Sequence, residues 1–495
     1  MTREQIIWLT ICSYVIFIAA IGFASNKQTK SMGDYVVGGR SAGAWMSAFS
    51  YGTAYFSAVM FIGYAGGTGW KYGIWGVLPG IGNAIIGTLV AWLLLAKRTR
   101  TFTRENKIKS MPQFFEKTFG SRAMKLFSAI VIFIFLIPYS ASVYKGLTSV
   151  CSVLLGVDEL VCMIVIAAAS AVIVVAGGYI AALKADFFQG AVMLVGVMCL
   201  IAAVFRSDAV GGLSEGFSRI AAETEELGLN AFAHVGLWAT VLMTSFGTWG
   251  LPQMIHKYYG IKDDHEVKRA TVISTVFSLV VAGGGYLIGS LSHLFFSELP
   301  EGGTDYLVPN MLATAGLADV LVGIVLVLLI AASVSTLSSI TITAASTLTM
   351  DLVREVFIKD KNKNVAGMTK IACMLFVVLS FVLAVWGDGT PILDMMSYSW
   401  GIIAGCFLAP YAVSLYWKGI TRAGAWASMI GGFIVAVPPL AAKLAGWNIT
   451  VGGFGKLMDM GPHFACLAMA VSLILVFAAS ALEKNKIPKS ASQEA

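Results

Sequence analysis

The stretch that decides the fold is Ile330 to Asp351, which reads IAASVSTLSSITITAASTLTMD. It is long enough to cross a bilayer, which takes about 20 residues, and it carries no charge before Asp351. Yet two helical turns hold Ser333, Ser335, Thr336, Ser338 and Ser339. Because helix residues three and four positions apart share a face, Ser335, Thr336 and Ser339 lie together. Such a face suits either close helix packing or a hard cation.

The rest of the chain has the composition of a polytopic membrane protein. Of its 495 residues, 57% are hydrophobic and 12% are charged, against about 25% charged in soluble domains. The seven cysteines form no C-x-x-C pair, and the five histidines show no metal spacing or His-x-x-x-His motif. We therefore predict a protein that is not an enzyme, with no catalytic residues, and no nucleic acid as a partner.

Hydrophobic runs of about 20 residues predict about thirteen transmembrane helices in an all-α fold. The runs lie at 5–25, 44–70, 73–96, 123–150, 159–182, 187–205, 234–255, 270–296, 317–350, 367–386, 393–416, 424–445 and 462–482.

The basic residues predict the orientation of these spans. Most of the 34 Lys and Arg residues fall in alternate loops, such as the loop with Lys27 and Lys30, the segment 97–122, the loop with Lys257 and Lys262, and the segment 354–363. Cytoplasmic loops are enriched in such residues. We expect the N-terminus outside, the C-terminus inside, and contact between the basic segments and membrane lipids.

Two spans are poor candidates for continuous helices. The second holds the sequence SYGTAYFS at 50–57, and the seventh holds TSFGTWGLP at 244–252. Unwound backbone is tolerated at membrane depth where it lines a cavity, and paired breaks five spans apart indicate an inverted repeat with its binding site at the breaks. The alternative is that these Gly and Pro residues only pack or kink ordinary helices.

Asp186 is an unusual carboxylate, because it follows Gly177 and Gly178 closely and opens the predicted span 187–205. One interpretation is an N-terminal helix cap. The other is a ligand for a cation that crosses the protein, since ionisable groups within membranes tend to face such pathways.

Four motifs in this order resemble the sodium:solute symporter family. They are DYVVGGRS at 34–41, GGYIA at 177–181 followed by Asp186 and Gln189, WGLPQ at 249–253, and STLS at 335–338 followed by Asp351. The resemblance covers nearly the whole chain and extends to proline, pantothenate, sialic acid and sugar symporters.

The resemblance implies a LeuT-type core with a five-plus-five inverted repeat. Residues 1–43 would form a peripheral helix and a cytoplasmic loop, 44–205 the first repeat, 234–416 the second repeat, and 417–495 two trailing helices and a cytoplasmic tail. It also implies a multi-pass protein of the bacterial cell membrane. We expect it to function as a monomer.

The resemblance further implies one or two coupling sodium ions. The main site would use the carbonyl groups of Thr53, Phe56 and Ala332 and the hydroxyl groups of Ser335 and Thr336. A second site would use Asp186, Ser338 and Ser339. Neutral oxygens suit a hard ion that must also be released.

The solute would bind between the two breaks. Candidate lining residues, whose alternative role is packing, are Tyr55, Ser57, Trp75, Tyr139, Thr244 and Thr248. Proline symporters of the family have an aspartate at Tyr55 and aromatic residues at Thr244 and Thr248, which puts proline in doubt.

We therefore predict a sodium-coupled symporter that imports a small, carboxylate-bearing solute such as an amino acid, a monocarboxylate or a pantothenate-like acid. The alternative is a passive facilitator or channel.

Overall fold

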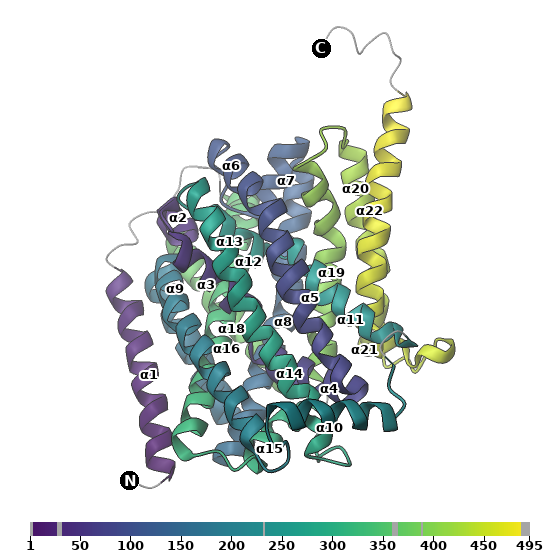
Figure 1. Cartoon of the computed structure of the whole chain (residues 1–495). Helices are drawn as coiled ribbons and strands as arrows, with labels where there is room; N and C mark the ends of the chain where they lie inside the picture. Colours follow the sequence, from purple (N-terminus) through teal and green to yellow (C-terminus); the bar gives the residue numbers. More distant parts are fainter. Residues whose placement is uncertain (1–2, 27–31, 231–232, 359–364, 388–389, 487–495) are drawn as a thin grey trace.

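The computed structural model describes residues 3–26, 32–230, 233–358, 365–387 and 390–486. Over these residues the chain is a bundle of helices, and the described part contains no β-strand (Figure 1). The predicted all-α class is confirmed. Helix α1 begins at one end of the bundle, and helix α22 ends at the opposite end.

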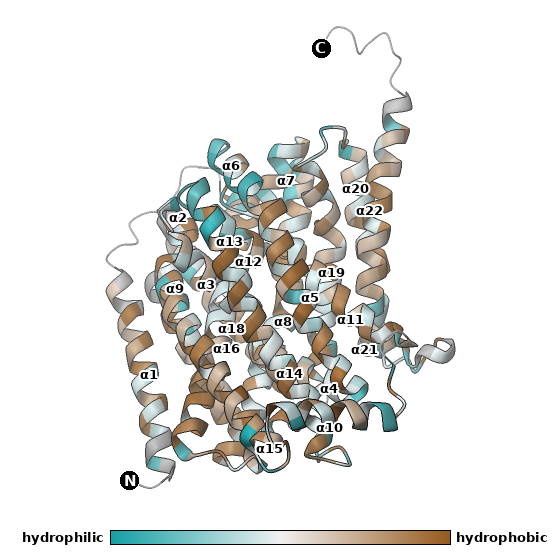
Figure 2. Cartoon of the chain, viewed as in Figure 1, coloured by the Kyte–Doolittle hydropathy of each residue, from teal (hydrophilic) through white to brown (hydrophobic). Residues whose placement is uncertain are grey.

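The bundle has the surface of a membrane protein. Figure 2 shows hydrophobic residues along the middle of the helices and hydrophilic residues at the two ends, over α6, α7 and α13 at one end and α10 at the other. Nine helical segments among the described residues are long and apolar enough to span a bilayer.

The chain up to residue 206 forms both long and interrupted helices. The α-helices are α1 (Arg3–Asn26), α2 (Met32–Val37), α3 (Ala44–Tyr55), α4 (Ala65–Tyr72), α5 (Leu78–Ala84), α6 (Lys97–Glu105), α7 (Met111–Phe119), α8 (Arg122–Leu155) and α9 (Glu159–Arg206). The 3-10 and π-helical turns are η1 (Gly38–Arg40), η2 (Met60–Tyr64), η3 (Gly73–Val77), η4 (Ile85–Val90) and η5 (Trp92–Ala96).

The remaining chain repeats this mixture. Its α-helices are α10 (Leu213–Glu226), α11 (Val235–Phe246), α12 (Pro252–Tyr259), α13 (Asp264–Ser278), α14 (Gly284–Ser290), α15 (Leu307–Thr314), α16 (Asp319–Thr347), α17 (Arg354–Phe357), α18 (Ala366–Trp386), α19 (Ile392–Ser414), α20 (Arg422–Ala436), α21 (Pro438–Ala445) and α22 (Gly461–Lys486). The short turns are η7 (Gly247–Trp249), η8 (Leu279–Gly283), η9 (Ser292–Leu294), η10 (Gly303–Tyr306), η11 (Leu348–Val353), η12 (Gly452–Phe454) and η13 (Leu457–Asp459).

The spans predicted from the sequence differ from the nine segments for identifiable reasons. The second half of the second span joins the third span in one helical run, Met60–Glu105, and the first half forms α3. The first span and the fifth appear as shorter apolar helices, Trp8–Gly22 and Glu159–Val175. The seventh is divided between α11 and α12. Lys27, Lys30, Lys359, Lys361, Lys363 and the tail after residue 486 lie outside the described residues.

The bend in α9 corrects the interpretation of Asp186. The sequence placed the start of a helix at residue 187, but the backbone turns at Gly178, where φ is 58° and ψ is −147°. Only glycine adopts such a conformation readily. Asp186 therefore lies eight residues after the bend, inside a helix, and the alternative interpretation as an N-terminal helix cap is wrong.

Helix α16 lies at the centre of the bundle, where it packs against α1, α3, α8, α9 and α18. Its residues are buried without interruption from Val325 to Ser346. The hydroxyl groups of a helix that is buried on all sides are shielded from bulk water. We therefore expect their hydrogen-bond partners to lie within the protein.

Candidate functional site

Helix α3 ends at Tyr55, in the middle of the buried core. Phe56 has an extended backbone, with φ of −103° and ψ of 105°, and a further helical turn begins after Ser57. The last carbonyl groups of a helix lack partners within it. The break therefore leaves carbonyl oxygens near Thr53 and Phe56 available to neighbouring groups, as the sequence predicted.

Helix α16 lies against this break. The Thr336 hydroxyl donates a hydrogen bond to the Thr53 carbonyl oxygen at 3.0 Å. Thr53, Phe56, Ala332 and Thr336 are completely buried. The predicted main sodium ligands on α3 and α16 are thus in contact through one hydrogen bond.

Ser335 connects this region to Asp186 on α9. Its hydroxyl donates to Asp186 Oδ1 at 2.6 Å, and Ser50 on α3 donates to Asp186 Oδ2. Since a hydroxyl has one proton and two lone pairs, the oxygen of Ser335 keeps acceptor capacity for a cation. Asp186 itself is completely buried.

Lys257 also reaches Asp186, although the sequence placed it in a cytoplasmic loop. It lies on α12, is 3% exposed, and its Nζ donates to Asp186 Oδ2 at 3.2 Å. The same ammonium donates to Ser50 and to Ser339, each at 2.8 Å. The loop placement was wrong because α12 is the second half of the interrupted span, and all of its residues are buried.

Ser338 completes the residues predicted for the second sodium site. Its hydroxyl is buried and has no hydrogen-bond partner among the described residues, and the same holds for Ser333. The structure therefore brings Asp186 and Ser339 together through Lys257, whereas Ser338 contacts neither of them by a hydrogen bond.

The second break lies in the seventh predicted span, between α11 and α12. The backbone passes through η7 and becomes extended at Leu251, with φ of −80° and ψ of 119°. Tyr55, beside the first break, donates from its hydroxyl to the Thr244 carbonyl at 2.6 Å. The two interrupted segments therefore meet in the core.

Most candidate solute-binding residues surround this meeting point. Tyr55 and Tyr139 both pack against Trp400 of α19, with ring centroids 6.2 Å and 5.6 Å apart. Thr248 donates to the Gly87 carbonyl at 3.2 Å. Ser57 is buried in the break and accepts from the Val59 amide at 3.3 Å.

Trp75 does not join this group. It lies on η3, is 36% exposed, and its short helix packs against α4, α10 and α14. Trp400, in contrast, belongs to the group although the sequence did not single it out. The aromatic pair formed by Tyr398 and Trp400 inside an apolar run was the available signal.

A cavity of about 310 Å³ lies beside α4, α11 and the start of α19. Thr68 of α4, Thr240 of α11 and Asp394 of α19 line it, together with Lys71 and His463. Thr240 lies one helical turn before Thr244. A larger cavity of about 690 Å³ lies between α8, η10 and the start of α19.

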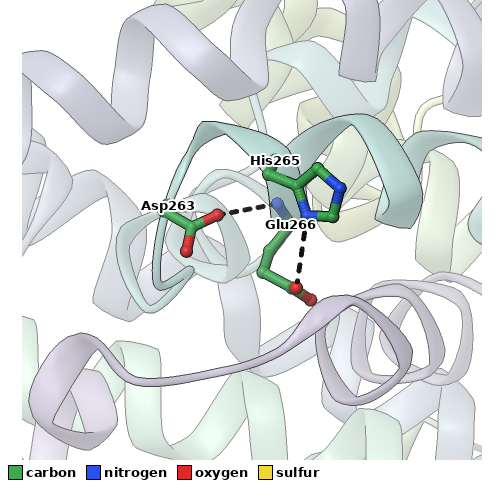
Figure 3. Close-up of side chains that lie close together, drawn as sticks. All are labelled: Asp263, His265 and Glu266. Carbon is green, nitrogen blue, oxygen red and sulfur yellow. Dashed lines mark hydrogen bonds and ion pairs between the residues drawn. The ribbon is translucent and has the colours of Figure 1, made fainter.

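A separate group of acidic and histidine side chains lies at the start of α13, outside the core. Figure 3 shows Asp263, His265 and Glu266 close together. Asp263 accepts from the Glu266 amide at 2.9 Å, which is a helix N-cap. Glu266 accepts from the Ala44 amide at the start of α3. This group therefore joins two helix ends.

Comparison with known proteins assigns the family. Residues 35–432 match the Sodium:solute symporter family. The chain belongs to the sodium:solute symporter family. The resemblance recognised in the sequence motifs is thereby confirmed, and the candidate sodium and solute-binding residues lie within the matched range.

Similar proteins extend over nearly the whole chain. The osmoregulated proline transporter OpuE of Bacillus subtilis is 28% identical, over 93% of this chain and 94% of its own. A sodium/proline symporter of Staphylococcus aureus is 26% identical, over 97% and 93%. The solved structure of a Na⁺-coupled sialic acid symporter superposes with a TM-score of 0.76 at 18% identity, over 96% and 98%. That likeness shows the fold.

Proposed function

We propose that this protein couples the inward movement of sodium to the uptake of a small organic solute by alternating access. The observation that carries the proposal is the contact between the broken helix α3 and the hydroxyl face of α16, where the Thr336 hydroxyl meets the Thr53 carbonyl. Membership of the sodium:solute symporter family supports it.

The main sodium site would use the oxygens of Thr53, Phe56, Ala332, Ser335 and Thr336. These are three backbone carbonyl groups and two hydroxyl groups, all buried. Neutral oxygens of this kind suit a hard monovalent cation. Because α3 and α16 each supply part of the set, the bound ion would hold the two helices together.

The architecture that we propose is thirteen transmembrane helices in a five-plus-five inverted repeat, with spans two to six in residues 44–205 and spans seven to eleven in 234–416. The matched breaks in α3 and between α11 and α12 support the repeat. The opposite positions of the start of α1 and the end of α22 support an odd number of crossings (Figure 1).

The solute that we propose carries a carboxylate, as an amino acid does. Tyr55, Ser57, Tyr139, Thr244 and Thr248 would surround it, and hydroxyl groups and helix ends would bind the anionic group. Relatives named as proline transporters make proline a candidate again, although the chain has Tyr55 where proline symporters of the family have an aspartate.

The proposal is tested by purifying the protein, reconstituting it into vesicles, and following the uptake of labelled proline, other amino acids, monocarboxylates and pantothenate. We expect at least one of these to accumulate when a sodium gradient is imposed, and to equilibrate without accumulation when sodium is equal on both sides. If the uptake of every transported solute is independent of the sodium gradient, the passive facilitator is favoured instead.

A further inference from the structure

We propose that the ammonium group of Lys257 is a tethered cation that replaces a second sodium ion beside Asp186, so that a single sodium ion accompanies each solute. This inference rests on the proposed function and adds the number of coupling ions. It concerns Asp186, Ser338 and Ser339, the residues predicted for a second sodium site. The sequence left open whether the protein uses one coupling sodium ion or two.

The ammonium already has the contacts that a bound cation would make. Its three N–H groups go to Ser50 Oγ at 2.8 Å, Ser339 Oγ at 2.8 Å and Asp186 Oδ2 at 3.2 Å. The side chains of Lys257 and Asp186 are 2% and 0% exposed. Two of the three residues expected to hold sodium are therefore bonded to a fixed positive charge.

The hydrogen bonds of this set leave few oxygen positions for a sodium ion. Asp186 Oδ1 accepts from Ser335 at 2.6 Å, and Asp186 Oδ2 accepts from both Ser50 and Lys257. Only the Ser338 hydroxyl lacks a hydrogen-bond partner among the described residues of this set. Hard cations such as Ca²⁺ require six or more oxygen ligands, and sodium likewise needs several.

Charge balance also argues against a second sodium ion beside Asp186. The pair of Asp186 and Lys257 is neutral, and within the described residues each is the other's ion-pair partner. The Tyr179 ring lies 5.5 Å from Lys257 Nζ and adds a favourable cation–π contact. A second cation would place two positive charges side by side in a region of low dielectric constant, where their repulsion is strong.

The pair also connects to the main sodium site. The Ser335 hydroxyl donates a hydrogen bond to Asp186, and its oxygen keeps lone pairs for an ion beside Thr336 and Thr53. By holding Asp186, the Lys257 ammonium helps to orient Ser335, which is one ligand of the main site. Under this proposal no second sodium ion is needed for that role.

The inference is tested by counting sodium ions in the purified protein with radioactive sodium binding, and by measuring the charge moved per neutral solute in vesicles. For the unaltered protein we expect a single bound ion per chain, one charge per solute, and a Hill coefficient for sodium of about 1. Two bound ions per chain, or two charges per solute, would overturn the proposal.

The Lys257→Met variant removes the tethered charge and leaves Asp186 to attract an ion. We expect it to bind one additional sodium ion, with a Hill coefficient that rises toward about 2. The control is Lys184→Met, two residues before Asp186 and only partly buried, which should bind as the unaltered protein does. A folded Lys257→Met protein with no additional ion would contradict the proposal.

The double variant Asp186→Asn with Lys257→Met tests whether the additional ion requires the charge of Asp186. Because both side chains are then uncharged, we expect this variant to fold and to bind no additional ion. If Lys257→Met alone cannot be purified, the ion count and charge per solute of the unaltered protein decide the question. An unaltered protein whose solute uptake ignores sodium would instead refute the proposed function, and the two failures are distinguishable.

Discussion

Single oxygen atoms join the elements of the candidate sodium site. The Thr336 hydroxyl bridges α16 and α3 through the Thr53 carbonyl, and the Ser335 hydroxyl bridges α16 and α9 through Asp186. Both hydroxyl groups come from the stretch in which hydroxyl residues were too frequent for simple packing. Of the two roles that the sequence left open for this face, a cation site now has the better support, because its neighbours are oxygens.

Replacing Thr336 by alanine should weaken sodium binding about tenfold, equivalent to roughly 1.4 kcal/mol, because the ion loses an oxygen ligand and α16 loses its bond to α3. Sodium-dependent thermal stabilisation of the purified protein measures the effect. Ser333→Ala is the matched control, since Ser333 is a buried hydroxyl on the same helix. Equal losses of affinity in both variants would argue against the site.

Asp186→Asn should destabilise the protein strongly, by roughly 3 kcal/mol, because it leaves the Lys257 ammonium buried without its counter-charge. Adding Lys257→Met to this variant should restore a large part of the loss, a coupling that a double-mutant cycle measures. Thermal denaturation in detergent is the readout. Additive effects of the two substitutions would show that the ion pair contributes nothing specific.

At the scale of helices, the breaks position these residues. Gly178 turns the backbone of α9 so that the segment carrying Asp186 passes α3 and α16. Tyr35 packs directly on this glycine, and its hydroxyl donates to the Val174 carbonyl at 2.9 Å, on the other side of the bend. The bend is therefore held by packing as well as by backbone preference.

Gly178→Ala should destabilise the protein by several kcal/mol. A Cβ there would lie 2.5 Å from a ring carbon of Tyr35, and φ of 58° with ψ of −147° is strained for alanine. Gly156→Ala is the control, because Gly156 ends α8 in the left-handed region with nothing within 4 Å of an added Cβ, so we expect a loss of about 1 kcal/mol. Thermal denaturation compares the two variants.

The contact between η10 and α19 should depend on pH. Asp305 accepts from the Ile392 amide at 3.0 Å, and its burial raises the pKa of the carboxyl to about 6. An aspartate in the unfolded chain has a pKa of about 3.9. The stabilisation that the protonated Asp305 carboxyl provides is therefore complete below that pH and is lost as the pH rises through about 6.

We therefore expect the protein to unfold at lower temperature at pH 7 than at pH 4.5 by an amount that Asp305→Asn removes, since asparagine keeps an acceptor oxygen for Ile392 and cannot ionise. Thermal denaturation of both proteins across this pH range measures the difference. An identical pH dependence in the variant would contradict the assignment to Asp305.

The sequence predicted some of these features and missed others for physical reasons. Hydrophobic length located α16, α18 and α22 within a few residues, because the bilayer imposes that length. The position of Asp186 within its helix was missed, since the helical segment after the bend begins at Gly178, well before residue 187, where the predicted span starts. Lys257 was missed because basic residues near a span normally mark its cytoplasmic end.

Across the whole molecule, charge is divided between the two ends of the bundle. At the end near α6, Arg100 donates to Asp264 at 2.7 Å and to the carbonyl groups of Ile261 and Lys262. At the other end, Asp158, Glu159 and Asp305 line the larger cavity, with Lys145. The end rich in arginine is the one where α22 finishes (Figure 1), as expected of a cytoplasmic face.

This division predicts which residues face outside. A cysteine introduced at Glu301, an exposed position between α14 and α15, should react with a membrane-impermeant thiol reagent on intact cells. A cysteine at Glu105, exposed at the end of α6, should react only after the membrane is permeabilised. The unaltered protein, with its seven native cysteines, supplies the background. Labelling of Glu105→Cys but not Glu301→Cys on intact cells would reverse the orientation and would place the larger cavity on the cytoplasmic side.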